Sequence, residues 1–454
     1  MLGFDVPRGV SRSTSSPLSL STLLLPPHSH LSLQSNPAVG FPFSLWLRFL
    51  RENRSKLSLR RSLRYLPRLL FVTSFSLLSS LLSSLESLLY PPSLVRAQPL
   101  HPSPIFILGA PRTGTTLLHN LLSLSPALST CSTFCAAFPA SFLLAERFRA
   151  LFSPFLPPTR PMDAMRLHWD LPQEDELGTC VLAAGASPYS MLYFMSPVDD
   201  LLPLYTLSPL SPQTARWTAA FRLLLQKLTL RASLSSSPGR LLLKSPVHTA
   251  RVPHLLALFP DAKFVHVRRD PREVFRSAVH MANTTYHHTY LAEPGEGEVL
   301  EFILRQNEVL WGELDRAKMF GLLDRDNFVE VAYEDLVGDA GGVVERVWEA
   351  LGVEPGEGFW ERFREETEAL EAYEPNERRE MDGDVAELVE SRWGKWTRAW
   401  GYAEGEDVQA MIESVPRFPW ESAKPVPKSE EAGVGEFMMS QTWMRAGCKC
   451  PDCL

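Results

Sequence analysis

The chain has 454 residues, which is enough for one large domain with appendages or for two domains. Its hydrophobic content of 45% and charged content of 21% are ordinary for a globular protein. Residues 1–100 carry eleven Lys and Arg against three Asp and Glu, a net of +8, so with −7 for the whole chain the remainder carries −15. An acidic body repels phosphate backbones, which argues against a nucleic-acid-binding protein.

The N-terminal part of the chain divides into two predicted segments. Residues 1–60 are interpreted as a disordered or targeting segment, since the first forty are rich in Ser, Leu and Pro. Residues 61–99 are predicted to be a hydrophobic helical segment. Within it, residues 69–90 have the length of a membrane span, and the basic stretch before them would keep the N-terminus in the cytosol.

Seven serines, one threonine and Glu86 in residues 69–90 make membrane insertion marginal. A helix that packs on the body of the protein, or lies at a membrane surface, therefore fits about as well as a spanning helix. We expect membrane association, in the form of a type II Golgi protein, ahead of a cytoplasmic location.

A strand, a tight turn and a helix are predicted in the sequence PIFILGAPRTGTTLL, which begins at residue 104. Gly109 opens the turn and Gly114 closes it, with the glycine spacing of a Walker A loop. Thr115 stands where Walker A has its lysine, and Arg112 is the one cation in the loop. A turn of this kind can bind nothing, but the packed Pro, Arg and hydroxyl residues favour an anion site. The sequence predicts an anion other than a magnesium-bound nucleoside triphosphate.

Alternating strands and helices follow and indicate an α/β protein. We predict a P-loop-type three-layer fold with a central, mainly parallel sheet flanked by helices, in a domain that spans residues 100–420. A tail then covers residues 421–454. The predicted strands are Ile105–Leu108, Leu241–Leu243, Phe264–Val267 and Phe328–Val331, and predicted helices include 211–232 and Val343–Leu351. Ligands bind such sheets outside the carboxyl ends of the strands, where Arg112, Lys244 and Arg269 are expected.

A second candidate anion site lies in KFVHVRRDPREVFRSAV, which begins at residue 263. Arg269 follows a predicted strand, and Ser277 comes eight residues later on the following helix. A guanidinium and a hydroxyl placed in this way can converge on one phosphate. Asp270 and Pro271 offer an alternative, because they are also a good helix start beside a surface arginine.

The two sites, in this order and on matching elements, resemble the sulfotransferases that use 3′-phosphoadenosine-5′-phosphosulfate (PAPS). The segments RPMDAMRLHWDLPQEDE, LLLKSPVHTARVPHLLALFPDAKF and VEVAYEDLV resemble the branch of that family found in bacteria, fungi and algae. The resemblance implies that the loop holds the 5′-phosphosulfate, that a later Arg and Ser hold the 3′-phosphate, and that no metal takes part. It places PAPS on Arg112, Thr113, Gly114, Thr115, Thr116, Arg269 and Ser277.

The resemblance also implies the catalytic groups. Arg112 would stabilise the departing bisphosphate, and a general base would take the proton of the acceptor hydroxyl. Glu174 is preferred as that base, because a glutamate serves in the membrane-bound branches of the family, and His248 is second. Both have alternatives: the acidic cluster can begin a helix, and His248 can be a satisfied loop histidine. The cytosolic aryl and steroid enzymes carry a shorter Lys-to-His spacing than the KSPVH element of this chain.

The leading hypothesis is a sulfotransferase that moves a sulfuryl group from PAPS to a hydroxyl or amine acceptor, with small-molecule, carbohydrate and peptide acceptors open. One alternative is a P-loop nucleotide kinase or NTPase, which Thr115 disfavours. Another is a catalytically decayed, membrane-anchored interaction protein, against which the intact Arg112, Arg269 and Ser277 argue.

Overall fold

The computed structural model describes residues 37–57, 62–160, 162–163, 165–209, 211–235, 239–371 and 380–403. A five-stranded sheet lies at the centre, with the strand order β2-β3-β1-β4-β5 and parallel pairing throughout. The predicted strands and the mainly parallel sheet are confirmed. The strands are β1 (Ile105–Leu108), β2 (Ser129–Thr130), β3 (Leu241–Lys244), β4 (Lys263–Arg268) and β5 (Phe328–Ala332). The edge strand β2 was not predicted, because two residues are too few to give a pattern.

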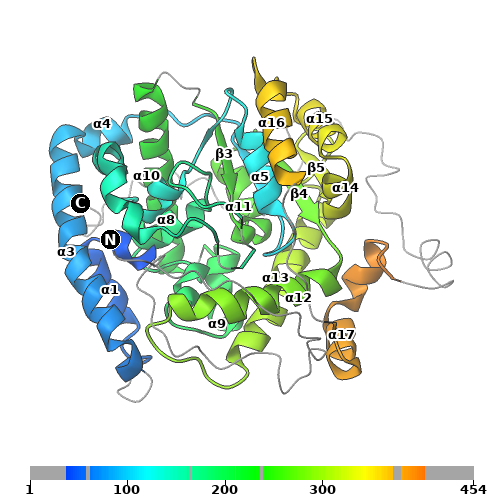
Figure 1. Ribbon diagram of the computed structural model, residues 1–454, viewed down its shortest axis with the longest axis horizontal. Helices are drawn as coiled ribbons and strands as arrows, with labels where there is room; N and C mark the ends of the chain where they lie inside the picture. The colour runs from blue at the N-terminus through cyan, green and yellow to red at the C-terminus, as the bar shows by residue number, and fades with distance from the viewer. Residues whose placement is uncertain are drawn as a thin grey trace, which may run out of the picture.

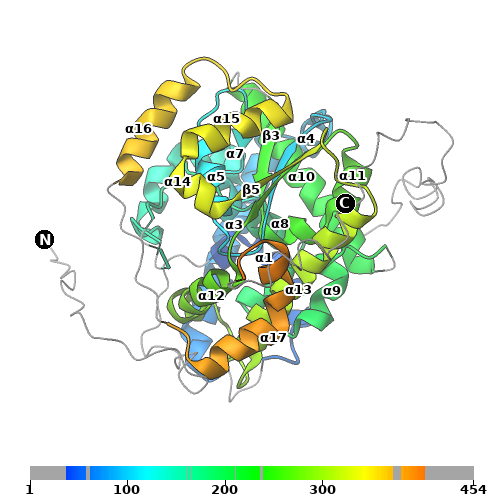
Figure 2. The ribbon, with the colours of Figure 1, turned by 90° about the vertical axis from the view of Figure 1, so that its right-hand side faces the viewer.

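Helices cover both faces of the sheet and make the three-layer α/β fold (Figure 2). In β1, Ile105 and Ile107 join one apolar cluster, whereas Phe106 and Leu108 join another on the opposite face. The first cluster packs under α5 (Thr115–Ser123), α14 (Tyr333–Gly338), α15 (Ala340–Leu351) and α16 (Phe359–Glu371). The second packs under α10 (Pro212–Leu234), α11 (Val252–Leu258) and α13 (Glu298–Met319).

The predicted helices within 211–232 and Val343–Leu351 are thus confirmed as α10 and α15. The remaining elements surround the carboxyl edge of the sheet or extend along its sides. They are η1 (Pro37–Gly40), α1 (Phe43–Glu52), η2 (Leu63–Tyr65), α3 (Leu66–Leu89), α4 (Pro92–Arg96), α6 (Thr133–Ala137), α7 (Phe142–Ala145), η3 (Glu146–Phe155), α8 (Asp175–Leu182), η4 (Pro188–Leu192), α9 (Val198–Tyr205), η5 (Pro246–Ala250), α12 (Pro271–Thr285), η6 (Tyr286–His288) and α17 (Gly383–Ala399).

The N-terminal boundary differs from the one predicted. Residues 37–57 form η1 and α1 and pack on the body, whereas the sequence placed them in a disordered or targeting segment. Trp46 and Phe49 of α1 are buried, and the Trp46 Nε1 donates to Thr73 Oγ1 of α3 at 2.9 Å. Large aromatic side chains bury enough apolar surface to hold a short helix in place. Residues 1–36 and the predicted tail, 421–454, lie outside the described residues.

The hydrophobic segment of the sequence is the helix α3, which runs along one side of the molecule (Figure 1). Among the described residues, Leu63–Leu89 is the one stretch whose length and composition would allow it to cross a membrane, and 22% of its most apolar window is buried. Four of its polar side chains are buried, namely Arg68, Ser76, Ser79 and Glu86. Glu86 forms an ion pair of 2.6 Å with Lys227 of α10, and both side chains are buried. The helix is therefore tied to the body of the protein by polar contacts.

Candidate active site

The loop between β1 and α5 has the backbone of a phosphate-binding turn. Gly109 and Gly114 have φ values of 146° and 96°, which side chains other than glycine rarely adopt. A Cβ at Gly114 would lie 2.2 Å from the ring of Tyr333. Thr113 closes the loop, because its hydroxyl donates to the carbonyl of Ala110 at 2.9 Å. The first amides of α5 face the loop without partners in their own helix, as at any helix N-terminus.

A cavity of about 570 Å³ opens over this loop and contains six of the seven residues predicted to bind PAPS. Thr113 is the exception, since its buried side chain serves the loop itself. The other six lie on three separate elements: the loop and first turn of α5, the end of β4, and α12. The six lining residues are Arg112, Gly114, Thr115, Thr116, Arg269 and Ser277.

Direct contacts join the two predicted anion sites. The Nε of Arg112 donates to the Ser277 hydroxyl at 3.0 Å, and Arg269 donates to the backbone carbonyl of Arg112 at 3.2 Å. Arg112 itself has a φ of 73°, a left-handed conformation that a long side chain seldom adopts. Residues 165 positions apart in the sequence thus meet in one cavity. We call this cavity the donor cavity, after the ligand that the sequence predicts for it.

Tyr333 and Asp163 complete the donor cavity, and neither was among the predicted site residues. The guanidinium of Arg269 lies 3.9 Å from the centre of the Tyr333 ring, a cation–π contact that holds the arginine in place. Asp163 forms ion pairs with Arg112 at 3.0 Å and with Arg160 at 3.3 Å. The sequence offered no signal for Asp163, because the contact joins two distant loops.

A second cavity, of about 290 Å³, meets the first at the loop. Arg112, Thr115, Thr116 and Met162 line both cavities. Glu174 lines this second cavity, which we call the acceptor cavity. Two molecules held in the two cavities would therefore meet beside Arg112.

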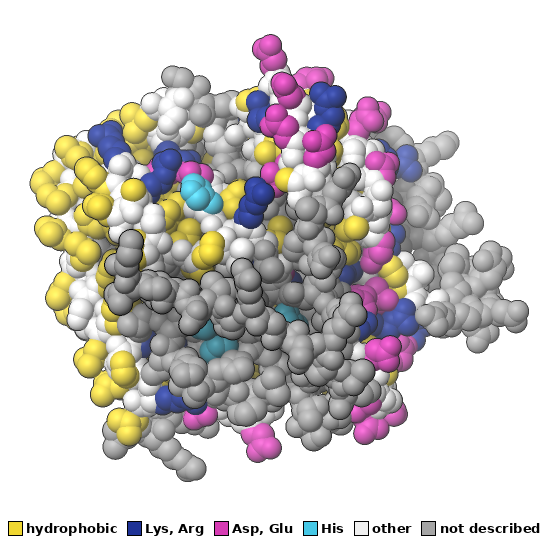
Figure 3. Space-filling model, in the orientation of Figure 1, with side chains coloured by type: hydrophobic (Ala, Val, Ile, Leu, Met, Phe, Trp, Pro, Cys, Tyr) yellow, Lys and Arg dark blue, Asp and Glu magenta, His cyan; other side chains and the backbone are white. Residues whose placement is uncertain are grey.

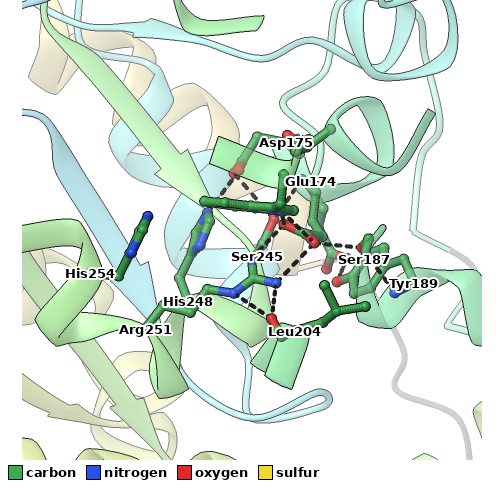
Figure 4. Close-up of polar contacts among 12 residues, drawn as sticks. Glu174, Asp175, Ser187, Tyr189, Leu204, Ser245, His248, Arg251 and His254 are labelled. Carbon is green, nitrogen blue, oxygen red and sulfur yellow. Dashed lines mark hydrogen bonds and ion pairs between the residues drawn. The ribbon is translucent and has the colours of Figure 1, made fainter. Parts of the chain in front are cut away.

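Glu174 lies beside the junction in a network with Lys244 and Tyr189, and Figure 4 shows Glu174 and Tyr189 in this network. Lys244 Nζ lies 2.7 Å from one carboxylate oxygen of Glu174 and 3.3 Å from the Thr116 hydroxyl, while Tyr189 donates to the other oxygen at 2.5 Å. Burial raises the pKa of Glu174, but Lys244 and Tyr189 outweigh burial and hold the pKa below its ordinary value. Burial likewise lowers the pKa of Lys244, against the opposing effect of Glu174. Glu174 is thus a carboxylate at neutral pH.

His248, the second predicted base, lies in the core and lines neither cavity. Its Nε2 is 2.8 Å from Asp175, whose other carboxylate oxygen accepts from the Ser245 hydroxyl at 3.2 Å. Glu176 is also buried, where it pairs with Arg251 at 2.7 Å. The three consecutive acids at the start of α8 therefore take different environments, and of these three Glu174 is the one that lines a cavity.

Lys244 is the site residue that sequence reasoning came closest to finding. It ends β3, a central strand, and was expected at the carboxyl edge of the sheet, yet it was not assigned a role. Its contact with Thr116 depends on β3 pairing directly with β1, which the sequence does not reveal.

Residues 104–357 match a family model described as the sulfotransferase family. The chain belongs to this family. The match begins at the residue before β1 and includes the loop, Glu174, Arg269 and Ser277. The predicted family is confirmed, and membership sets the nucleotide kinase alternative aside.

Individual relatives agree with this assignment. The chain is 29% identical over 365 residues to the omega-hydroxy-beta-dihydromenaquinone-9 sulfotransferases of Mycobacterium bovis and Mycobacterium tuberculosis, and the match covers 80% of this chain and 90% of each relative. Among solved structures, STF1 of Mycobacterium tuberculosis matches with 19% identity and a TM-score of 0.51, over 77% of this chain and 90% of the other. STF9 of Mycobacterium avium matches with 17% identity and a TM-score of 0.52, over 73% and 85%. Both structures have the same fold.

Proposed function

We propose that the protein transfers a sulfuryl group from PAPS to a hydroxyl group on a small, largely apolar acceptor. The observation that carries the proposal is the convergence of Arg112, Arg269 and Ser277 in the donor cavity. A loop with one arginine and no Walker lysine suits a phosphosulfate. A second arginine with a hydroxyl suits the further phosphate that distinguishes PAPS from adenosine 5′-phosphosulfate.

In this proposal the 5′-phosphosulfate lies on the first amides of α5 and the hydroxyls of Thr115 and Thr116. The 3′-phosphate replaces the present contact between Arg112 and Ser277 as the partner of the Ser277 hydroxyl, and Arg269 binds it from the end of β4. Tyr333 keeps the Arg269 guanidinium facing the cavity. The donor cavity, with Arg112 and Arg269 on two separate elements and Ser277 on a third, thus selects a ligand with two separated anionic groups.

Transfer proceeds in line across the junction of the cavities. The acceptor oxygen forms a bond to sulfur as the bond between sulfur and the bridging phosphate oxygen breaks, and Glu174 takes the acceptor proton. The products are a sulfate ester and 3′-phosphoadenosine-5′-phosphate. Arg112 stabilises the charge that develops on the leaving phosphate, and Lys244, in contact with Thr116, adds a second cation at the same point.

The lining of the acceptor cavity supports an apolar acceptor. Apart from the junction residues, most of its side chains are hydrophobic, which suits a hydrocarbon skeleton better than a sugar or a charged peptide. They include Phe138, Phe155, Leu156, Trp169, Met191 and Leu192. The mycobacterial relatives are named for an omega-hydroxylated menaquinone derivative, an acceptor of this apolar kind.

Donor recognition is tested with two fragments of the donor, one that lacks the sulfuryl group and one that lacks the 3′-phosphate as well. The affinity of the protein for 3′-phosphoadenosine-5′-phosphate is compared with that for adenosine 5′-monophosphate and for magnesium-ATP, by calorimetry and by thermal shift. We expect the bisphosphate to bind roughly 10- to 100-fold more tightly than the monophosphate, the value of one charge-assisted phosphate contact.

The double variant Arg269→Gln/Ser277→Ala should lose this preference while its affinity for the monophosphate stays the same. A variant at a loop hydroxyl, Thr116→Val, is the matched control and should weaken both ligands alike. Equal affinity for the two nucleotides in the unmodified protein would disprove the assignment of the donor, and binding of neither would favour the catalytically decayed alternative.

A further inference from the structure

The outer side of α3 is an exposed row of leucines, which we call the leucine face. These side chains are 42–77% exposed, and several recur every seven residues, so they lie on one side of the helix. A row of this length is larger than the scattered apolar residues of an ordinary protein surface. Figure 3 shows hydrophobic side chains gathered over the edge that α3 forms in Figure 1. The leucine face consists of Leu63 in η2, which leads into α3, and of eight leucines on α3 itself: Leu66, Leu70, Leu77, Leu78, Leu81, Leu85, Leu88 and Leu89.

Four of the five buried side chains of α3 are polar, with Val72 the fifth and Phe71 and Phe75 half-buried beside them, whereas a helix on a soluble protein usually buries an apolar side. Arg68 is buried and donates to the backbone carbonyl of Tyr290 at 2.6 Å, and the Ser79 hydroxyl donates to the carbonyl of Val39 at 2.7 Å. Glu86 is paired with the buried Lys227. The helix is thus fixed by polar contacts along its length and directs its apolar side away from the protein.

Arginines border the leucine face at both ends. Arg51 and Arg54 are exposed at the end of α1, whose contact through Trp46 and Thr73 places it beside the first half of α3. At the other end Arg96 is exposed, and Arg147 donates to the hydroxyl of Tyr90, the residue after α3. Glu52 is the one exposed carboxylate in the described part of residues 43–100, and it is paired with Arg216 at 2.7 Å. The arginines at both ends of the leucine face can pair with anionic lipid headgroups.

We propose that the leucine face docks the protein on the surface of an anionic lipid bilayer, with α3 lying in the plane of the interface. An apolar side between basic borders is the pattern of helices that lie in this plane. A spanning arrangement would detach Glu86 from Lys227 and leave a buried ammonium without its carboxylate, which is strongly unfavourable. The packing of α3 thus favours surface docking over the membrane span that the sequence also allowed.

The position of α3 next to the acceptor cavity gives this docking a role, a step that rests on the proposed function. Phe155 lines the acceptor cavity and contacts Phe75 and Phe71 of α3, with ring centres 5.5 and 6.4 Å apart. The cavity therefore lies one side chain from the docking helix. An acceptor dissolved in the bilayer would reach the cavity from the surface to which the protein is bound.

Docking is tested by flotation of the full chain with vesicles of phosphatidylcholine and phosphatidylglycerol at about three to one, and with vesicles of phosphatidylcholine alone. We expect most of the protein to float with the anionic vesicles and at least several-fold less with the neutral ones. The variant Leu77→Gln/Leu81→Gln should reduce binding to anionic vesicles by roughly tenfold or more, because two buried leucines are lost from the interface. Glutamine keeps the helix propensity.

The control Met319→Gln/Phe320→Gln changes two equally exposed apolar side chains at the end of α13 and should bind vesicles normally. Circular dichroism and an unfolding midpoint close to that of the unmodified protein confirm that each variant is folded, and neither this check nor vesicle binding depends on the donor. Failure of the docking proposal is therefore distinguishable from failure of the proposed function.

Three results would overturn the proposal. The first is equal flotation of the leucine variant and the control. The second is resistance of the bound protein to extraction by alkaline carbonate, which would indicate a spanning helix. The third is a stable dimer in the absence of lipid that the leucine variant converts to a monomer, since a second copy would then cover this face.

Discussion

Glu174 is one of three consecutive acids, and its neighbours determine which of the three can act on a substrate. Asp175 is held by His248, and Glu176 by Arg251, both in the core. Glu174 instead lines the acceptor cavity and contacts Lys244. A carboxylate beside a lysine that also reaches the loop can take a proton at the point where the proposed donor would lie.

We expect Glu174→Gln to lower kcat by roughly 10²- to 10⁴-fold, the usual effect of removing a general base. The affinity for 3′-phosphoadenosine-5′-phosphate should not change, because the amide still accepts a hydrogen bond from Lys244. The measurement is turnover with a labelled donor beside donor calorimetry. In the unmodified protein, activity should fall on the acid side only as the pH drops below the ordinary value of about 4.5 for a glutamate, since the pKa of Glu174 is lowered.

Asp170→Asn is the matched control for this substitution, because it removes an exposed carboxylate nearby in the sequence that pairs with Arg149. It should leave kcat unchanged. Near-normal turnover in Glu174→Gln, with unchanged donor affinity, would contradict the assignment of the base.

The structure brings together the predicted site residues whose placement depends on local spacing. The loop glycines, Arg112, and the pair Arg269 and Ser277 each belong to one strand–turn–helix unit, so their placement follows from the chain itself. Lys244 and Asp163 depend on which strands and loops become neighbours, and that information is not local. For the same reason Glu174 could not be separated from His248 until the burial of each was known.

At the scale of elements, α3 was the segment whose hydrophobicity allowed the most interpretations. Its composition predicted a helix but not its orientation, because the side that faces the protein is chosen by partners far away in the sequence. Lys227 lies on α10, more than a hundred residues from Glu86. The helix α1 was not predicted, for a related reason. Its few buried aromatic residues follow a Ser- and Pro-rich stretch, and the composition of that stretch indicated disorder.

The buried pair of Glu86 and Lys227 should account for much of the attachment of α3. Glu86→Leu leaves Lys227 buried without its carboxylate and should cost about 3–5 kcal/mol in the free energy of unfolding. The double variant Glu86→Leu/Lys227→Met replaces both charges with apolar groups and should recover most of that loss. Denaturant unfolding of the two single variants and the double variant measures the coupling.

If the losses in unfolding free energy of the two single variants add up to that of the double variant, the ion pair between Glu86 and Lys227 is contradicted. That result would also weaken the argument that α3 stays on the body of the protein, because the cost of detaching the helix would then be small.

At the scale of the whole molecule, a buried histidine in the helix that follows the first strand makes the fold sensitive to acid. His119 of α5 is fully buried under the donor loop. Burial, together with the nearby Lys244, lowers the pKa of His119 to about 3. The unfolded chain takes up this proton near pH 6.5, whereas the native protein excludes it down to about pH 3. The unfolded state therefore binds more protons between these values, and stability falls as the pH decreases through this range.

Lowering the pH from 7.5 to 5 should cost about 2 kcal/mol through His119 alone. The variant His119→Leu should show a correspondingly smaller drop in unfolding free energy between the two pH values. His168→Leu changes an exposed imidazole and should keep the full acid sensitivity of the unmodified protein. If the unfolding free energy of His119→Leu depends on pH in the same way as that of the unmodified protein, this histidine is not the cause of the acid sensitivity.

Phe155 separates the acceptor cavity from α3 by the thickness of one ring. For a protein docked through the leucine face, encounters with the acceptor take place in two dimensions. The rate would then follow the mole fraction of acceptor in the lipid and not its amount per volume of solution. Diluting the acceptor with inert lipid, at constant total acceptor, would slow the reaction as a competitive inhibitor does.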